Sequence, residues 1–223
     1  LSPKAKSRLV KIAPGIDTDH FAPDSTSEQL RSDLGLADKR VIVSVGRLVH
    51  RKGQDILIQS LPAILEKHPT AHILMVGEGP YRKDLTKMVE KLKLSDAVTF
   101  IGRIQYKDLP RYICAGDIFA MPSRSRLAGL EVEGLGIVYL EASACGLPVI
   151  VGNSGGAVDA VLDKKTGLLV DGTKSDQIAD AICELLANPE RAKQMGADGR
   201  DWVIKNWQLS TWSEKFNKVL IGN

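Results

Sequence analysis

The chain has 223 residues, of which 43% are hydrophobic and 26% charged, a composition typical of a soluble globular protein with a full core. The 30 basic and 27 acidic residues leave a net charge of +3, which is too balanced to indicate a polyanionic partner. Aromatic residues make up only 5%, which argues against a nucleic-acid surface that stacks bases.

The first segment, residues 8–14, predicts a short apolar strand, and a short helix is expected at 26–34 within a polar connection. From residue 41 onward, short β-branched runs alternate with segments of helical periodicity. The predicted strands are 41–45, 72–76, 97–101, 118–121, 148–151 and 167–170, and the predicted helices are 54–67, 81–94, 106–115, 135–144, 174–187, 190–205 and 209–220. This alternation predicts an α/β fold, a Rossmann-like, doubly wound parallel sheet with helices on both faces.

Doubly wound sheets bind ligands at the carboxyl ends of their strands, so the loops after the predicted strands are the candidate sites. The first such loop contains Gly46, Arg47, Lys52 and Gly53. Arg47 can bind a phosphate as a fork and Lys52 as a point charge, beside the first amides of a helix. A solvated basic turn is the alternative interpretation of this loop.

Two further loops are less specific when taken alone. The segment 77–80 reads Gly-Glu-Gly-Pro, and glycines there, Gly77 among them, allow a ligand to approach the backbone. The residues Gly102, Arg103 and Ile104 follow the third strand and can line a pocket for a base. Each segment is also compatible with a plain turn or strand end.

The loop before the helix at 135–144 carries the strongest pattern. Glu133 and Glu141 are separated by seven residues, and the predicted helix begins between them. The free amides of Gly136, Ile137 and Val138 at this helix N-terminus suit a diphosphate. Acidic residues near a helix start are also common as simple complements of the helix dipole.

Together these segments resemble the C-terminal domain of retaining glycosyltransferases of the GT-B fold, the glycosyl transferase group 1 family. The resemblance covers roughly residues 41–185 and rests on the order and spacing of four motifs. They are Gly46-Arg47 to Lys52-Gly53, the 77–80 turn, Phe100-x-Gly102, and Glu133 with Glu141. The segment 125–136 is similar to actinobacterial GDP-mannose-dependent phosphatidylinositol monomannoside mannosyltransferases.

The resemblance implies a role for each residue. Arg47, Lys52 and Glu133 are the expected catalytic residues: the two cations neutralise the donor diphosphate, and Glu133 holds hydroxyls of the transferred sugar. Glu141, as an ionised carboxylate, accepts hydrogen bonds from the ribose hydroxyls. The remaining expected donor-binding residues are Gly46, Gly77, Gly102, Arg103, Ile104, Gly136, Ile137 and Val138. We expect no metal site and no cofactor beyond the nucleotide sugar, since the chain has only four scattered histidines.

The implied function is that of the donor-binding domain of a hexosyltransferase that transfers mannose from GDP-mannose to a phosphatidylinositol mannoside or related glycolipid. We expect residues 1–40 to form a linker with a first strand, 41–187 the donor domain, and 188–223 helices that cross to a missing N-terminal acceptor domain. The start at Leu1, without Met or a signal-peptide pattern, indicates a piece of a longer chain that is inactive by itself.

The partners and location follow from the same resemblance. Membrane contact is expected only through the missing half, and exposed C-terminal aromatics could form a homo-oligomer contact. No nucleic acid is expected. The distant Cys114, Cys145 and Cys183 predict no disulfide framework, so a reducing cytoplasm fits, with peripheral attachment to the inner face of the plasma membrane in the full-length protein.

Three alternatives stay open. The donor domain could use UDP- or ADP-glucose, since nothing physical in the sequence selects guanine. The chain could be a non-catalytic module that binds nucleotide sugars. It could also bind anionic surfaces through the basic residues of 4–11 and 47–52, although acidic residues are interspersed with basic ones along the chain.

Overall fold

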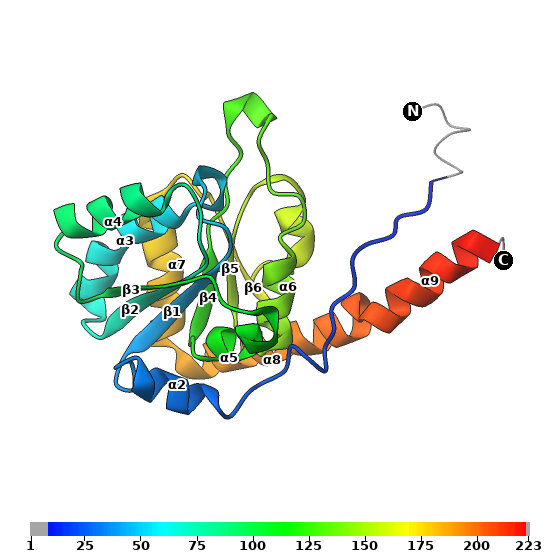
Figure 1. The fold of residues 1–223 in the computed structure, drawn as a ribbon, viewed down its shortest axis with the longest axis horizontal. Coiled ribbons are helices and arrows are strands. Elements are labelled where there is room, and N and C mark those ends of the chain that lie inside the picture. The colour runs from blue at the N-terminus through cyan, green and yellow to red at the C-terminus, as the bar shows by residue number, and fades with distance from the viewer. Residues whose placement is uncertain (1–8, 222–223) are drawn as a thin grey trace.

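The computed structural model describes residues 9–221, in which six strands form a single parallel sheet (Figure 1). The strands are β1 (Arg40–Val45), β2 (Ala71–Val76), β3 (Val98–Gly102), β4 (Ile118–Met121), β5 (Val149–Gly152) and β6 (Gly167–Val170). Each lies within two residues of its predicted range. The register pairs Val41 with His72 and Ile42 with Ile118, so β1 has a parallel partner on each side.

The strand order is β3-β2-β1-β4-β5-β6, with β1 and β4 adjacent at the centre. This order places the reversal of chain winding between β1 and β4, which is where such sheets open a crevice at their carboxyl edge. The predicted Rossmann-like, doubly wound fold is therefore confirmed.

Helices cover both faces of the sheet (Figure 1). Their bounds are α2 (Ser27–Asp33), α3 (Gln54–Lys67), α4 (Arg82–Lys91), α5 (Leu109–Cys114), α6 (Ile137–Ala144), α7 (Ser175–Ala187), α8 (Pro189–Trp207) and α9 (Leu209–Ile221). Alternate residues of β1 serve the two layers: Val41 and Val43 pack with residues of α2, α5, α6 and α8, and Ile42 packs with residues of α3, α4 and α7. This explains the continuous apolar run of β1, because both of its faces are buried.

The strand predicted at 8–14 is wrong for the residues that the structure describes. Residues 9–15 are irregular, and Leu9 and Val10 are exposed. Only Ile16 makes a bridge, to Gln208, with its N–H donating to the Trp207 carbonyl oxygen at 2.7 Å. An apolar run is not sufficient for a strand when no neighbouring strand supplies its hydrogen bonds.

The C-terminal helices behave in two ways. The rings of Trp202, Trp207 and Trp212 contact one another, with centroids 5.8 and 6.0 Å apart, so these aromatics pack within the domain. Helix α9 extends away from the sheet, and none of its described residues is buried (Figure 1). Phe216 on α9 is 48% exposed. None of the described helices has the length and apolarity that crossing a bilayer requires.

Candidate functional site

The carboxyl edge of the sheet holds a cavity of about 480 Å³ where the loops after β1 and β4 meet the start of α6. Its lining includes seven of the predicted site residues: Gly46, Lys52, Glu133, Gly136, Ile137, Val138 and Glu141. These residues are far apart in the sequence and come together because β1 and β4 are neighbours. The position is the one that the doubly wound topology reserves for ligands.

A second hollow of about 490 Å³ adjoins the first and shares Gly46 with it. Arg47, Gly77 and Arg103 line this hollow together with the rest of the 77–80 turn. A side chain at Gly77 would place its Cβ 2.1 Å from the Gly46 carbonyl oxygen, and φ at Gly77 is +131°. Glycine is therefore required there so that the loops after β1 and β2 can touch.

Two predicted residues line neither hollow. Gly102 closes β3, where its carbonyl oxygen accepts the Gly77 N–H at 2.8 Å, so it joins two of the site loops by their backbones. Ile104 is half-buried and packs against the apolar core on the α6 side of the sheet. Both are sequence neighbours of Arg103, which lines the second hollow, but Gly102 and Ile104 themselves contact other parts of the protein.

A buried ion pair forms part of the wall of the first cavity. The Lys52 Nζ lies 2.8 Å from Glu133 Oε2, and the two side chains are only 10% and 7% exposed. Lys52 ends the 3₁₀ turn His50–Lys52 that follows β1. A lysine and a carboxylate that face a cavity in this way can exchange one partner for a ligand phosphate or hydroxyl, whereas both would be costly to bury unpaired.

Several groups fix the Glu133 side of the pair. Ser123 Oγ donates to Glu133 Oε2 at 3.3 Å, and the Tyr139 hydroxyl lies 2.9 Å from Ser123 Oγ while donating to the Met121 carbonyl oxygen at 2.7 Å. The Glu133 N–H donates to Ser154 Oγ at 3.1 Å. Burial raises the pKa of the Tyr139 hydroxyl, which therefore keeps its proton and acts as a donor.

The N-terminus of α6 points into the same cavity. Gly136 precedes the helix with φ of +70°, and a Cβ there would lie 2.3 Å from the Tyr139 ring. This conformation starts α6 at Ile137, two residues later than predicted, and no side chain caps the helix. The first amides of the helix and its dipole are therefore available to an anion.

Glu141 lies one turn further along α6 and faces the cavity. Its pKa is raised to about 7 because burial disfavours the charged form. No hydrogen bond to its carboxylate is found among residues 9–221, so no protein donor offsets the burial. The sequence analysis expected an ionised carboxylate, whereas burial in this cavity favours the neutral form of Glu141.

A second buried ion pair joins three loops of the carboxyl edge and was not predicted from the sequence. Arg124 donates through Nη1 and Nη2 to the two carboxylate oxygens of Asp55, at 2.8 and 2.7 Å, and the Tyr81 hydroxyl donates to the same carboxylate at 3.2 Å. The Arg124 N–H also donates to the Arg51 carbonyl oxygen at 2.8 Å. These bonds fix the backbone on both sides of Lys52. The signal available in the sequence was the Ser-Arg-Ser-Arg run at 123–126.

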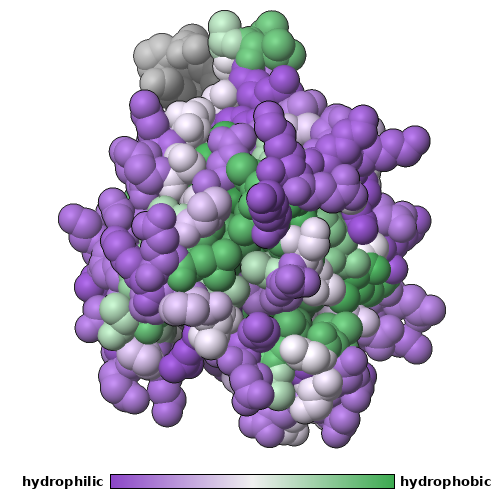
Figure 2. Space-filling view, turned by 90° about the vertical axis from the view of Figure 1, so that its left-hand side faces the viewer, coloured by the Kyte–Doolittle hydropathy of each residue, from purple (hydrophilic) through white to green (hydrophobic). Residues whose placement is uncertain are grey.

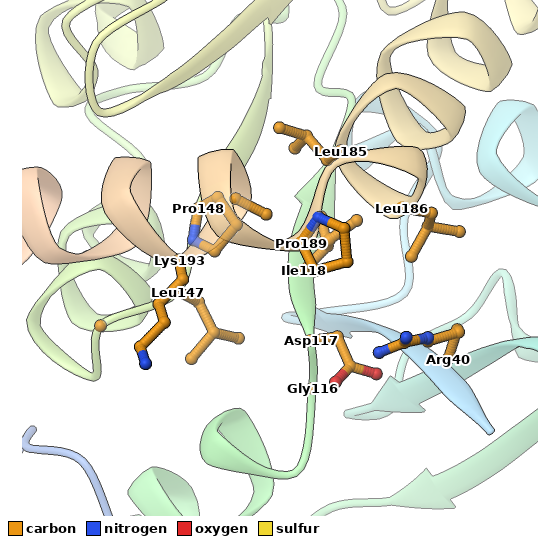
Figure 3. Close-up of a pocket in the computed structure, with 12 residues that line it drawn as sticks. Arg40, Gly116, Asp117, Ile118, Leu147, Pro148, Leu185, Leu186, Pro189 and Lys193 are labelled. Atoms are coloured by element: carbon orange, nitrogen blue, oxygen red, sulfur yellow. The ribbon is translucent and has the colours of Figure 1, made fainter. Parts of the chain in front are cut away.

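Another cavity, of about 240 Å³, lies at the opposite, amino edge of the sheet (Figure 3). Apolar side chains from α7 and α8 line one side of it, and Arg40 and Asp117 lie on the other. Asp117 is already bound, since it accepts the Val41 N–H at 2.6 Å and an Arg31 Nη at 3.1 Å. Because Asp117 is occupied by hydrogen bonds that hold the fold together, the cavity at the carboxyl edge is the better candidate site.

Comparison with known families and proteins gives the family of this chain. The glycosyl transferases group 1 family matches residues 26–202. A GDP-mannose-dependent alpha-(1-6)-phosphatidylinositol monomannoside mannosyltransferase of Mycolicibacterium smegmatis is 48% identical over 96% of this chain and 56% of its own length. A monoacylated-substrate counterpart from Corynebacterium glutamicum is 42% identical, over 94% of this chain and 55% of that protein. The chain thus spans about half the length of these curated relatives.

Solved structures give the same fold. Anabaena Alr3699/HepE in complex with UDP matches with a TM-score of 0.86 and 26% identity, over 95% of this chain and 57% of that chain. The C-terminal domain of a glycosyl transferase group 1 family protein (LpcC) from Francisella tularensis matches with a TM-score of 0.76 and 26% identity, over 87% of this chain and all of that one. The family match covers most of the sequence, and the chain belongs to the glycosyl transferases group 1 family.

Proposed function

We propose that this chain is the donor-binding part of a retaining mannosyltransferase that transfers mannose from GDP-mannose to a phosphatidylinositol mannoside or a related glycolipid. The observation that carries the proposal is the buried pair of Lys52 and Glu133, which shares one cavity with the N-terminus of α6 and with Glu141. The names of the mycobacterial and corynebacterial relatives support the donor and the lipid acceptor.

The cationic side of the site suits the leaving diphosphate. Lys52 is buried and held by Glu133, whereas Arg47 is exposed at the rim of the adjoining hollow. Together with the amides that begin α6, they would stabilise the negative charge that develops on the phosphate as the glycosidic bond breaks. The phosphate takes the place of Glu133 as a partner of the Lys52 ammonium, so the buried lysine keeps a negatively charged partner.

The acidic side of the site suits the sugars of the donor. Release of Lys52 leaves the Glu133 carboxylate free to accept hydrogen bonds from hydroxyls of the transferred hexose, and Ser123 still orients it. Glu141 would accept the ribose hydroxyls in its ionised form. Arg103, which lies between Gly102 and Ile104 and close to the exposed Tyr106, is the proposed contact with the base.

The proposed division of the chain places the donor domain at 41–187, with 1–40 and 188–223 leading to an N-terminal acceptor domain. The full-length match to the solved C-terminal domain from Francisella tularensis supports a separable unit. The extended α9, which buries none of its described side chains here, supports a contact with another domain. The donor domain alone is expected to bind nucleotide and to transfer no sugar.

Calorimetric titration of this chain with GDP, GDP-mannose, UDP and ADP tests the proposal. Tighter binding of GDP and GDP-mannose than of UDP or ADP supports it, and the absence of binding by every nucleotide contradicts it. Arg103→Ala, in the proposed base loop, should reduce the difference between GDP and UDP. Lys83→Ala on α4, which removes the same charge from an exposed position elsewhere, is the matched control.

A UDP-dependent donor site is the second candidate, and one observation favours it. The Anabaena neighbour has been solved with UDP and with UDP-glucose, at 26% identity and TM-scores of 0.86 and 0.85. The same titration decides between the two, because preferential binding of UDP over GDP selects this alternative. A natural non-catalytic module would bind nucleotide but yield no transferase activity when the relatives' N-terminal half is joined to it.

A further inference from the structure

The loop between β4 and α6 projects from the rim of the candidate site as a small hairpin, residues 125–132, which we call the rim hairpin (Figure 1). Arg126 and Glu131 pair across its base: the Arg126 N–H donates to the Glu131 carbonyl oxygen at 2.8 Å, and their side chains form an ion pair at 2.7 Å. The hairpin is joined at one end to Arg124, held by Asp55, and at the other to Glu133, held by Lys52.

The tip of the rim hairpin is apolar and has an unusual backbone. Leu130 is 88% exposed and Leu127 is 65% exposed. Leu127 and Ala128 both have φ of +52°, a left-handed conformation that residues with a Cβ rarely adopt. In the space-filling view, apolar atoms stand at the upper end of the molecule, with hydrophilic atoms directly below them (Figure 2). The fold therefore holds apolar side chains in water at a defined place beside the site.

We propose that the rim hairpin inserts its leucine tip into the acyl and headgroup boundary of the membrane that carries the lipid acceptor. The inference rests on the proposed function, because a glycolipid acceptor must bring its sugar to the donor at Glu133 while its acyl chains remain in the bilayer. An apolar projection on the rim of that site meets this need. It also places a membrane contact in this half of the enzyme, whereas the sequence analysis expected one only in the other half.

The small size of the tip favours a lipid surface over a protein partner. The two tip leucines, Leu127 and Leu130, expose far less surface than the roughly 800 Å² that each partner buries in a standard protein interface. Shallow insertion at a membrane interface depends on the apolar area that becomes buried, so it can begin with a few apolar side chains. Arg126 at the hairpin base is paired with Glu131, which leaves residues 125–132 without net charge.

Co-sedimentation of this chain with vesicles of phosphatidylcholine and phosphatidylinositol tests the inference. Leu130→Ser should lower the partition coefficient by about tenfold or more, as expected for the loss of one leucine from an apolar environment. Leu130→Trp should retain or raise it, because tryptophan favours the membrane interface. Leu220→Ser is the matched control, since Leu220 on α9 is as exposed as Leu127 but lies outside the hairpin.

Unchanged partition of Leu130→Ser, or a loss that only Leu220→Ser produces, would overturn the inference. So would a shift of Leu130→Ser from dimer to monomer in sedimentation equilibrium without any effect on vesicles, because the tip would then contact a second copy. GDP titration of the same variants separates the two proposals. Intact GDP binding without vesicle binding rejects the hairpin contact alone, and vesicle binding without nucleotide binding rejects the donor function.

Discussion

The ammonium nitrogen of Lys52 lies 2.8 Å from Oε2 of Glu133, and both side chains are almost completely buried at the carboxyl edge of the sheet. The two residues come from loops that follow β1 and β4, the strands between which the winding of the chain reverses. A buried ion pair gains little net stability, because the desolvation of two charges offsets their attraction. The Lys52–Glu133 pair instead supplies the proposed donor cavity with two charged groups. Each of them needs a new partner when a ligand separates the pair.

Lys52→Met tests this interpretation through stability. The substitution leaves the Glu133 carboxylate buried without its cation, and we expect a loss of about 3–5 kcal/mol in the free energy of unfolding. The double variant Lys52→Met/Glu133→Gln should recover most of this loss, since no buried charge is left. Urea unfolding of the wild type and the three variants of this cycle measures the coupling. Additive effects of the two substitutions would contradict the pairing.

Arg47→Ala tests the proposed phosphate contact without the loss of stability expected for Lys52→Met. Arg47 is exposed, so the variant should fold as stably as the wild type. Its affinity for GDP should fall by about 1.5–3 kcal/mol, the range for a hydrogen bond to a charged group. Calorimetry measures the change, with Lys83→Ala as the charge-matched control. An equal weakening in the control would show only a general effect of net charge.

The sequence predicted the fold more completely than the site, and particular residues show why. Most strands are short, mainly apolar runs with both faces buried, as in Val41 to Val45, and such a run is visible without knowledge of its neighbours. The run at 8–14 is also short and apolar, but among the described residues no strand pairs with 9–14. Strand formation depends on long-range hydrogen bonds that periodicity cannot supply.

The site residues were predicted by position, because glycines, cations and Glu133 all follow predicted strands. Their pairwise contacts were not. The Lys52–Glu133 pair depends on the adjacency of β1 and β4, and the Arg124–Asp55 pair joins residues 69 positions apart. The burial of Glu141 changes its protonation, which residue type alone does not reveal. Spatial neighbours and local dielectric are properties of the folded chain.

Asp55→Asn tests the unpredicted ion pair. Arg124 is only 12% exposed, and the neutral amide leaves its guanidinium without a buried counter-charge. We expect a loss of about 3–5 kcal/mol in the free energy of unfolding, measured by urea denaturation. Asp84→Asn, an exposed position on α4, should change stability by less than about 0.5 kcal/mol. Similar losses in both variants would mean that the Arg124 contact contributes nothing specific.

Two glycines near the start of α6 give a closely matched comparison. A Cβ at Gly136 would lie 2.3 Å from the Tyr139 ring, at a φ of +70°, whereas a Cβ at Gly134 would meet nothing within 4 Å. Gly136→Ala should therefore displace the helix start and weaken GDP binding by about tenfold or more, in line with a strain of at least 1–2 kcal/mol. Gly134→Ala should bind GDP as the wild type does. Equal affinities of the two variants would exclude the α6 amides from the phosphate contact.

The raised pKa of Glu141 leads to a prediction of how the stability of the protein varies with pH. Its folded pKa of about 7 lies above the ordinary value of 4.5, so the folded chain binds the proton more tightly than the unfolded chain does. The stabilising contribution is complete below pH 4.5 and is lost as the pH rises through 7, amounting to roughly 3 kcal/mol across that window. Glu141→Gln should remove this slope from the urea-derived stability curve. Glu90→Gln on the exposed face of α4 should leave it in place.

Nucleotide binding should respond to the same proton in the opposite direction. Ribose hydroxyls donate hydrogen bonds best to the ionised carboxylate, so GDP affinity should increase as the pH rises from 6 to 8, and binding near pH 7 should release protons. Calorimetry in buffers of different ionisation enthalpy measures the released protons directly. Burial favours the protonated form of Glu141, so Glu141 must lose this proton before its carboxylate can accept hydrogen bonds from the ribose. The prediction is contradicted if the affinity for GDP does not change with pH and Glu141→Gln also leaves it unchanged, because the ribose would then lie elsewhere.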